Sequence, residues 1–123
     1  MKNSFIKVSY RFLLILLSAI FAFAGIDKII LRPEMVQVFK ILGIPKEFMI
    51  VIGFTELMLA IMLQVRYFSK LALHGLIFIL SVAALLHLIS RDYNAFILPI
   101  SIIGITILTL RLGQMDRNLR SRL

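Results

Sequence analysis

The chain has 123 residues, of which 61% are hydrophobic, and its formal net charge is +8. Soluble domains average roughly 45–50% apolar residues, so a mean hydropathy of +1.02 is typical of a membrane protein. The basic residues stand between and beyond the apolar segments and form no separate basic domain, so we predict no nucleic-acid partner. The absence of cysteine excludes disulfides, thiol nucleophiles and cysteine-ligated iron–sulfur clusters. Any redox role therefore needs a bound cofactor or a partner protein.

Four apolar segments follow one another along the chain, at 12–31, 48–63, 71–89 and 95–112. Each has about 16–20 residues, or ~24–30 Å as a helix, which is close to the thickness of a hydrocarbon core. In lipid every backbone amide must be satisfied within the protein, and uninterrupted apolar runs achieve this as helices. We therefore predict an all-α fold, a four-transmembrane-helix bundle that forms one transmembrane domain over residues 1–123.

The first apolar segment allows a second interpretation. Basic residues precede it, and Ala22-Phe23-Ala24 before Gly25 resembles the cleavage site of a signal peptide. Cleavage there would remove the first helix. The apolar pattern continues past this site to Leu31, as in a spanning helix, and this favours a retained helix.

The segment between the first two spans has a pattern of its own. Apolar residues recur at helical spacing among polar ones over 34–42, which predicts a short amphipathic helix in the outer membrane interface. Pro33 suits its first turn, and Gly43 with Pro45 would end it.

The basic residues also predict the orientation. With the N-terminus inside, the cytoplasmic segments hold the larger set, Lys2, Lys7, Arg11, Arg66, Lys70, Arg111, Arg117, Arg120 and Arg122, against Lys28, Arg32, Lys40, Lys46 and Arg91 outside. Because cytoplasmic loops carry an excess of lysine and arginine, we predict that both termini are cytoplasmic.

One carboxylate stands out. Glu56 lies near the middle of the otherwise uncharged segment 48–63, where an ionisable group costs at least ~2.5–3.5 kcal/mol on insertion scales. It shares a helix face with Gly53 and Ala60, so it is expected to point into the bundle. Gly25 belongs to a similar stripe of small residues on the first helix, and we predict that Gly25 and Gly53 form a packing motif.

A partner for Glu56 should lie on a facing helix at similar depth. Lys28 and His87 fall in the outer half of the predicted bundle, within side-chain reach, whereas His74 falls near the inner end. We predict a cluster of Lys28, Glu56 and His87 that binds a ligand or relays protons. Its predicted rim consists of Asp27, Arg91 and Asp92.

Each of these residues also has a structural alternative. Lys28 and Asp27 lie about one turn from a helix end, where charged side chains commonly snorkel to the interface. Both histidines could be interfacial, and Glu56 could belong to a structural ion pair. The two histidines share one helix but face different sides, so the sequence does not favour haem, and we predict no metal site.

Three runs carry a family resemblance: FAFAGIDK at 21–28, FKILGIP at 39–45 and GFTEL at 53–57. With these runs the chain resembles the DoxX/DoxX-like family of small bacterial membrane proteins. Members show a glycine and a lysine late in the first helix, a G-x-x-E in the second and often a histidine late in the third. The corresponding residues are Gly25 and Lys28, Gly53 and Glu56, and, more loosely, His87.

The resemblance implies a four-helix bundle in the bacterial cytoplasmic (inner) membrane. It also implies a role beside oxidoreductases, because one relative is a subunit of a thiosulfate:quinone oxidoreductase. Our leading hypothesis is a quinone-interacting or accessory subunit of a membrane redox system, with a redox partner subunit or a second copy of the chain as partners besides lipid. The alternative is a non-enzymatic scaffold or small-solute carrier in which the cluster is a structural polar lock. Catalysis by the chain itself is left open.

Overall fold

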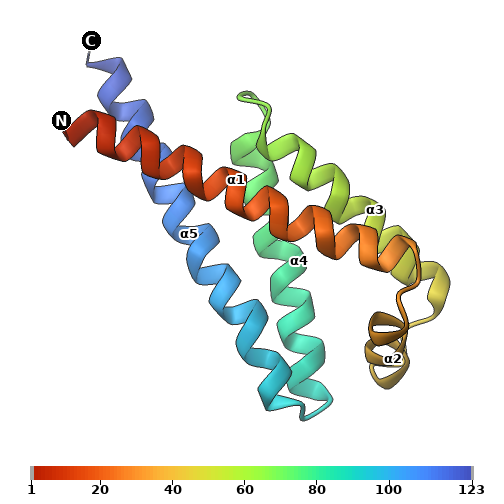
Figure 1. Ribbon diagram of the computed structural model, residues 1–123. Coiled ribbons are helices and arrows are strands. Elements are labelled where there is room, and N and C mark those ends of the chain that lie inside the picture. The colour runs from red at the N-terminus through yellow and green to blue at the C-terminus, as the bar shows by residue number, and fades with distance from the viewer. Residues whose placement is uncertain (1, 123) are drawn as a thin grey trace.

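The computed structural model describes residues 2–122 as a chain of five helices, with no strand in that range. They are α1 (Lys2–Ile29), α2 (Pro33–Ile41), α3 (Lys46–Leu63), α4 (Ser69–Ile89) and α5 (Tyr93–Ser121) (Figure 1). The all-α prediction is confirmed. The helices α1 and α5 extend beyond the predicted apolar segments into the basic sequence near the two termini.

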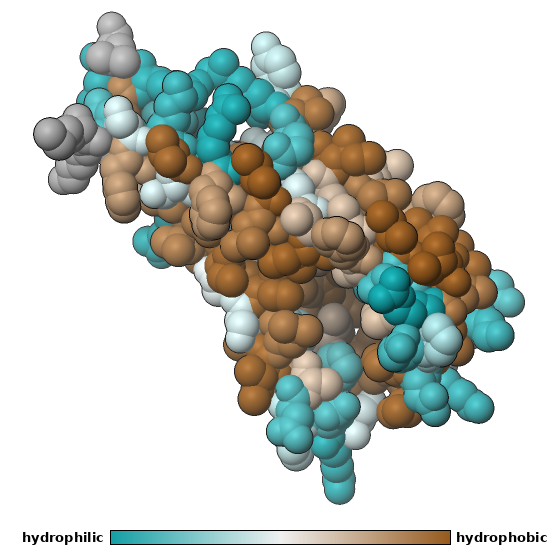
Figure 2. Space-filling view, viewed as in Figure 1, coloured by the Kyte–Doolittle hydropathy of each residue, from teal (hydrophilic) through white to brown (hydrophobic). Residues whose placement is uncertain are grey.

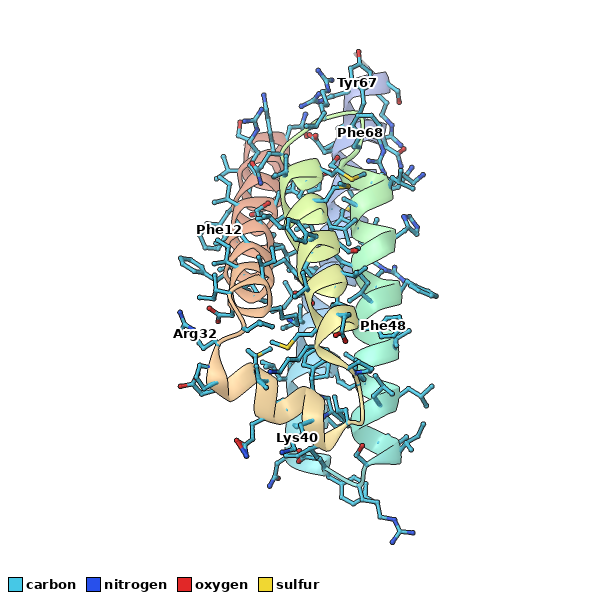
Figure 3. The ribbon with its side chains drawn as sticks, turned by 90° about the vertical axis from the view of Figure 1, so that its right-hand side faces the viewer. Phe12, Arg32, Lys40, Phe48, Tyr67 and Phe68 are labelled. Carbon is cyan, nitrogen blue, oxygen red and sulfur yellow. The ribbon has the colours of Figure 1, made fainter. Side chains whose placement is uncertain are left out.

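The four long helices alternate in direction. Both termini and the α3–α4 loop lie at one end of the molecule, which we call the terminal end, while α2 and the α4–α5 connection lie toward the other (Figures 1 and 3). The most extensive contacts pair α1 with α3 and α4 with α5. The two pairs diverge away from the terminal end, as Figure 1 shows.

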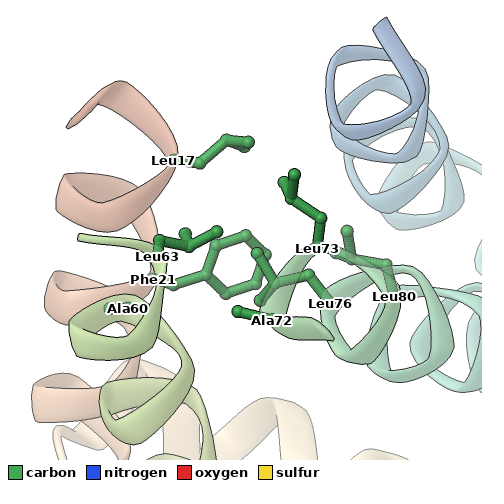
Figure 4. Close-up of a cluster of buried hydrophobic side chains, with 8 residues drawn as sticks. All are labelled: Leu17, Phe21, Ala60, Leu63, Ala72, Leu73, Leu76 and Leu80. Carbon is green, nitrogen blue, oxygen red and sulfur yellow. The ribbon is translucent and has the colours of Figure 1, made fainter. Parts of the chain in front are cut away.

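The shared core lies in the half nearer the terminal end. Leu17 and Phe21 of α1 meet Leu63 of α3 and Leu73 and Leu76 of α4, and all five are nearly inaccessible (Figure 4). Ala60, Ala72 and Leu80 complete this cluster. In lipid, helices associate through close packing rather than through removal of apolar surface from water. The interlocked side chains therefore hold the two pairs together here.

The outer surface is strongly apolar. Many large hydrophobic side chains are exposed, among them Phe5, Phe12, Phe23, Phe54 and Phe78. Figure 2 shows this apolar surface as a broad band between hydrophilic ends. A contiguous apolar surface of this extent needs a non-aqueous neighbour, and lipid is the neighbour that matches its position around the helices.

Three of the described helices are long and apolar enough to cross a membrane: α1 over Asn3–Ile29, α4 and α5. The helix α3 has 18 residues, or about 27 Å at 1.5 Å per residue, but it carries Lys46 and Glu47 at its start and Glu56 near its middle. The length of α3 is sufficient for a membrane span, whereas its charged residues are unfavourable in one. The prediction of four spans therefore depends on whether α3 crosses the membrane.

A helix also forms where the amphipathic segment is predicted. Pro33 takes the first position of α2, and the chain turns after Ile41 through Gly43, whose φ of +74° is readily adopted by glycine. Phe39 is buried while Lys40 and Ile41 are exposed. The position of α2 in a membrane interface stays a prediction.

Candidate functional site: a buried lysine–glutamate pair

The predicted glycines lie against each other where α1 crosses α3. A Cβ atom added at Gly25 would lie 2.6 Å from the carbonyl oxygen of Gly53, and one added at Gly53 would lie 2.7 Å from the carbonyl oxygen of Gly25. Both distances are far below van der Waals contact, so any side chain here would force the two backbones apart. The glycines therefore set the distance between α1 and α3.

Lys28 and Glu56 form an ion pair beside this crossing. The Lys28 Nζ lies 2.8 Å from the Glu56 Oε2, and the two residues are only 7% and 5% exposed. The Lys28 Nζ is also 3.5 Å from the carbonyl oxygen of Ala24 in the preceding turn. Each charged group therefore has an opposite charge beside it, which a buried ionisable group requires.

The helix geometry explains why these two residues meet. Lys28 follows Gly25 by three residues, and Glu56 follows Gly53 by three. Side chains on a helix lean toward its N-terminus, and α1 and α3 run in opposite directions (Figure 1). The two side chains therefore lean toward each other across the glycine crossing, which leaves room between the backbones.

The predicted rim residues lie elsewhere. Asp27 pairs with Arg32 at 3.2 Å, in a more exposed position, where such pairs contribute about 0–1 kcal/mol. Arg91 and Asp92 belong to the α4–α5 connection: Arg91 is exposed with a φ of +58°, and the Asp92 carboxylate accepts a hydrogen bond from the backbone N–H of Ala95. Within residues 2–122, no hydrogen bond or ion pair joins these three residues to the Lys28–Glu56 pair.

The two histidines of α4 differ in their surroundings. His74 is exposed, and its Nδ1 lies 2.8 Å from the carbonyl oxygen of Lys70. His87 is half-buried, and its Nδ1 is enclosed without a hydrogen-bond partner among the described residues. No hydrogen bond joins His87 to Lys28 or Glu56 in that part of the chain, so its membership of the cluster stays a prediction. The described residues contain no group of three potential metal ligands.

An analysis of hydropathy does not reveal several other polar contacts. Ser18 Oγ donates to the carbonyl oxygen of Ala60 at 2.9 Å and lies 2.6 Å from the Gln64 Nε2, which links α1 to the end of α3. Asp116 is buried on α5 and pairs with Arg120 at 3.4 Å. Asp116 continues a helical spacing of small and polar residues from Thr109 through Gly113. This spacing could have predicted that the last helix continues beyond residue 112.

Long apolar helices, alternating in direction and joined by a buried ion pair, place the chain among helical membrane proteins. A model of the DoxX-like family matches residues 12–109, and the chain belongs to this family. The matched range includes Gly25, Lys28, Gly53, Glu56 and His87. Neither the curated proteins nor the solved structures yielded a match to the chain.

Proposed function

We propose that the chain crosses the bacterial cytoplasmic membrane four times, with α3 as the span that composition alone does not identify. Two observations support this. Lys28 neutralises the one charge near the middle of α3, which lowers the cost of placing that helix in lipid. Both termini lie at the same end of the molecule (Figure 1), as an even number of crossings requires.

Labelling of single cysteines tests this topology, because the chain has no native cysteine. The exposed positions Ser4, Gln37 and Ser121 would each be changed to cysteine and treated in intact cells with a membrane-impermeant maleimide. We expect labelling of Gln37→Cys alone, with Ser4→Cys and Ser121→Cys reacting only after permeabilisation. Labelling of one terminus but not the other would contradict four spans.

We propose that the Lys28–Glu56 pair binds the headgroup of a quinone in an accessory subunit of a membrane redox system. The observation that carries this proposal is a charge pair held at 2.8 Å inside an apolar bundle. Ionisable groups at such depth commonly mark ligand sites and proton pathways. The association with redox proteins is what the resemblance to the DoxX/DoxX-like family implies.

The pair has suitable chemistry for a quinone. The Lys28 ammonium donates a hydrogen bond to a quinone carbonyl oxygen, and the Glu56 carboxyl passes protons to it. Reduction of a quinone to a quinol takes two electrons and two protons, and a redox partner subunit supplies the electrons. His87, whose Nδ1 has no hydrogen-bond partner within residues 2–122, connects the site to the end of the bundle that carries α2.

A quinone analogue tests this site directly. We expect Glu56→Gln to weaken binding of the analogue to purified protein by at least about tenfold, because it removes the carboxylate that holds the Lys28 ammonium in place and a hydrogen bond from a charged donor contributes about 1.5–3 kcal/mol. Glu47→Gln is the matched control, because Glu47 is an exposed glutamate in the first turn of the same helix. A folded Glu56→Gln protein that binds as tightly as the control would refute a quinone site at this residue.

The alternative is a membrane scaffold or small-solute carrier in which the pair is a structural lock. The observation that favours it is the glycine crossing, which leaves no room for a side chain between α1 and α3 at Gly25 and Gly53. Under this alternative Glu56→Gln lowers thermal stability in detergent without loss of a ligand. The wild-type protein then binds no quinone analogue.

A further inference from the structure

A pocket of about 630 Å³ opens at the terminal end of the molecule, far along the bundle from the Lys28–Glu56 pair. The N-terminal part of α1, the α3–α4 loop, the start of α4 and the last turns of α5 form its walls. Figure 3 shows Tyr67 and Phe68 of that loop at this end. The volume lies within the roughly 300–1,000 Å³ typical of small-molecule sites.

Most of the charged side chains that line this pocket are cationic. They are Lys7, Arg11, Arg66, Lys70, Arg117 and Arg120, with Asp116 as the acidic member. Asp116 is engaged by Arg120 at 3.4 Å, and Arg117 donates to the Gln114 side chain at 2.9 Å. Among residues 2–122, Lys7, Arg11, Arg66 and Lys70 have no carboxylate within ion-pair distance. The pocket therefore concentrates positive charge that the carboxylates of the described residues do not neutralise.

Hydrogen bonds also join polar residues that line the pocket. Ser69 Oγ donates to the carbonyl oxygen of Arg66 at 3.2 Å and lies 3.4 Å from the Tyr10 hydroxyl. The Tyr10 ring lies against Gly113 of α5, where an added Cβ would approach the ring to 2.8 Å. These contacts join α1, α4 and α5 within the lining of the pocket. The cations therefore stand on helices that contact one another.

We propose that this pocket binds a phosphate group, supplied by the headgroup of an anionic phospholipid. Arginine forks match the oxygens of phosphate, and basic pockets between membrane helices on the cytoplasmic side suit anionic headgroups. Leu14 and Ile15 also line the pocket, and Ile15 is exposed on the outer face of α1, so an acyl chain can continue along this helix. A soluble phosphate is the other source of the same chemistry.

The family match covers only part of this pocket. It covers residues 12–109, whereas Lys7, Arg11, Asp116, Arg117 and Arg120 lie outside that range. The proposal is also independent of the quinone site, because no residue is shared between the two. A failed quinone experiment leaves the phosphate pocket intact, and the reverse is equally true.

Lipid retention by the purified full chain tests the proposal. Delipidated protein in a neutral detergent would be titrated with phosphatidylglycerol or phosphatidylcholine, and bound lipid counted by native mass spectrometry. We expect Arg66→Gln/Lys70→Gln to weaken phosphatidylglycerol binding by about tenfold or more and to leave phosphatidylcholine binding unchanged. Lys40→Gln/Lys46→Gln is the matched control, because it removes two exposed charges around α2 at the opposite end.

A second arm of the experiment distinguishes the source of the phosphate. Inorganic phosphate would be added to the same lipid-free proteins while their thermal unfolding is followed. Stabilisation of the wild type by phosphate but not of Arg66→Gln/Lys70→Gln, without retained phosphatidylglycerol, supports the pocket with a soluble ligand. Equal retention of phosphatidylglycerol by the pocket variant and the control, with no effect of phosphate, overturns the proposal.

Discussion

Lys28→Met is expected to destabilise the folded bundle by about 3–5 kcal/mol, because it leaves the Glu56 carboxylate buried without its partner. The two groups are 2.8 Å apart and almost inaccessible, so water cannot replace the lost ammonium without opening the α1–α3 contact. Unfolding in detergent, followed by circular dichroism during a titration with a denaturing detergent, measures this loss. Lys46→Met removes an exposed lysine from the start of α3 and should leave stability unchanged within about 0.5 kcal/mol.

Removal of both charges should recover most of that stability. Buried ion pairs replaced by apolar side chains of similar volume are often neutral or stabilising, so Lys28→Met/Glu56→Leu should unfold close to wild type. The difference between the double variant and the sum of the single variants measures the coupling of the two residues. Additive effects of Lys28→Met and Glu56→Leu would contradict a direct pair.

Gly25→Ala is the substitution with the next largest expected effect, a loss of about 1–3 kcal/mol, as for other overpacked cores. The added Cβ would lie 2.6 Å from the Gly53 carbonyl oxygen and 3.0 Å from the Leu57 backbone nitrogen. Backbone atoms cannot move aside as side-chain tips can, so α1 and α3 must separate. The same unfolding titration measures the effect.

Gly104→Ala is the control for this substitution. Gly104 lies in α5, and an added Cβ there meets no atom within 4 Å. Since alanine is a better helix former than glycine by roughly 0.8–1.0 kcal/mol in water, the control should be as stable as wild type or more so. A Gly25→Ala protein as stable as Gly104→Ala would show that the crossing has room for a side chain.

The contact between Lys28 and Glu56 could be predicted from the sequence because its causes are local. A buried carboxylate needs an opposite charge, and Lys28 lies at the right depth, three residues after a glycine on the adjacent helix. The position of His87 relative to Lys28 and Glu56 depends instead on the angle between the α1–α3 and α4–α5 pairs. That angle is set by packing between segments far apart in sequence, and no periodicity within one helix reveals it.

The helix ends show a second limit of the sequence. Apolar segments at 12–31 and 95–112 mark where the chain meets lipid, whereas α1 begins at Lys2 and α5 continues to Ser121. Charged residues such as Lys7 and Arg117 end an apolar segment without ending a helix, because both are compatible with helical backbone. The phosphate pocket is built partly from these polar extensions, so an analysis of the apolar segments alone could not predict it.

The arrangement separates two kinds of site along one bundle. The core around Leu17, Phe21 and Leu76 fixes the helices in the half nearer the termini, and the cationic pocket opens beyond it. The Lys28–Glu56 pair lies on the other side of that core, close to the end of α1. A quinone headgroup and a phosphate group would therefore bind at different depths of the membrane.

The central claim is that the Lys28–Glu56 pair is a ligand site as well as a contact between helices. Binding of a quinone analogue to the folded Lys28→Met/Glu56→Leu protein, compared with wild type in the same detergent, tests it most directly, because this variant should keep the fold and lose the polar groups. We predict that wild type binds the analogue and that the double variant binds at least about tenfold more weakly. Equal binding by the two proteins would contradict the claim.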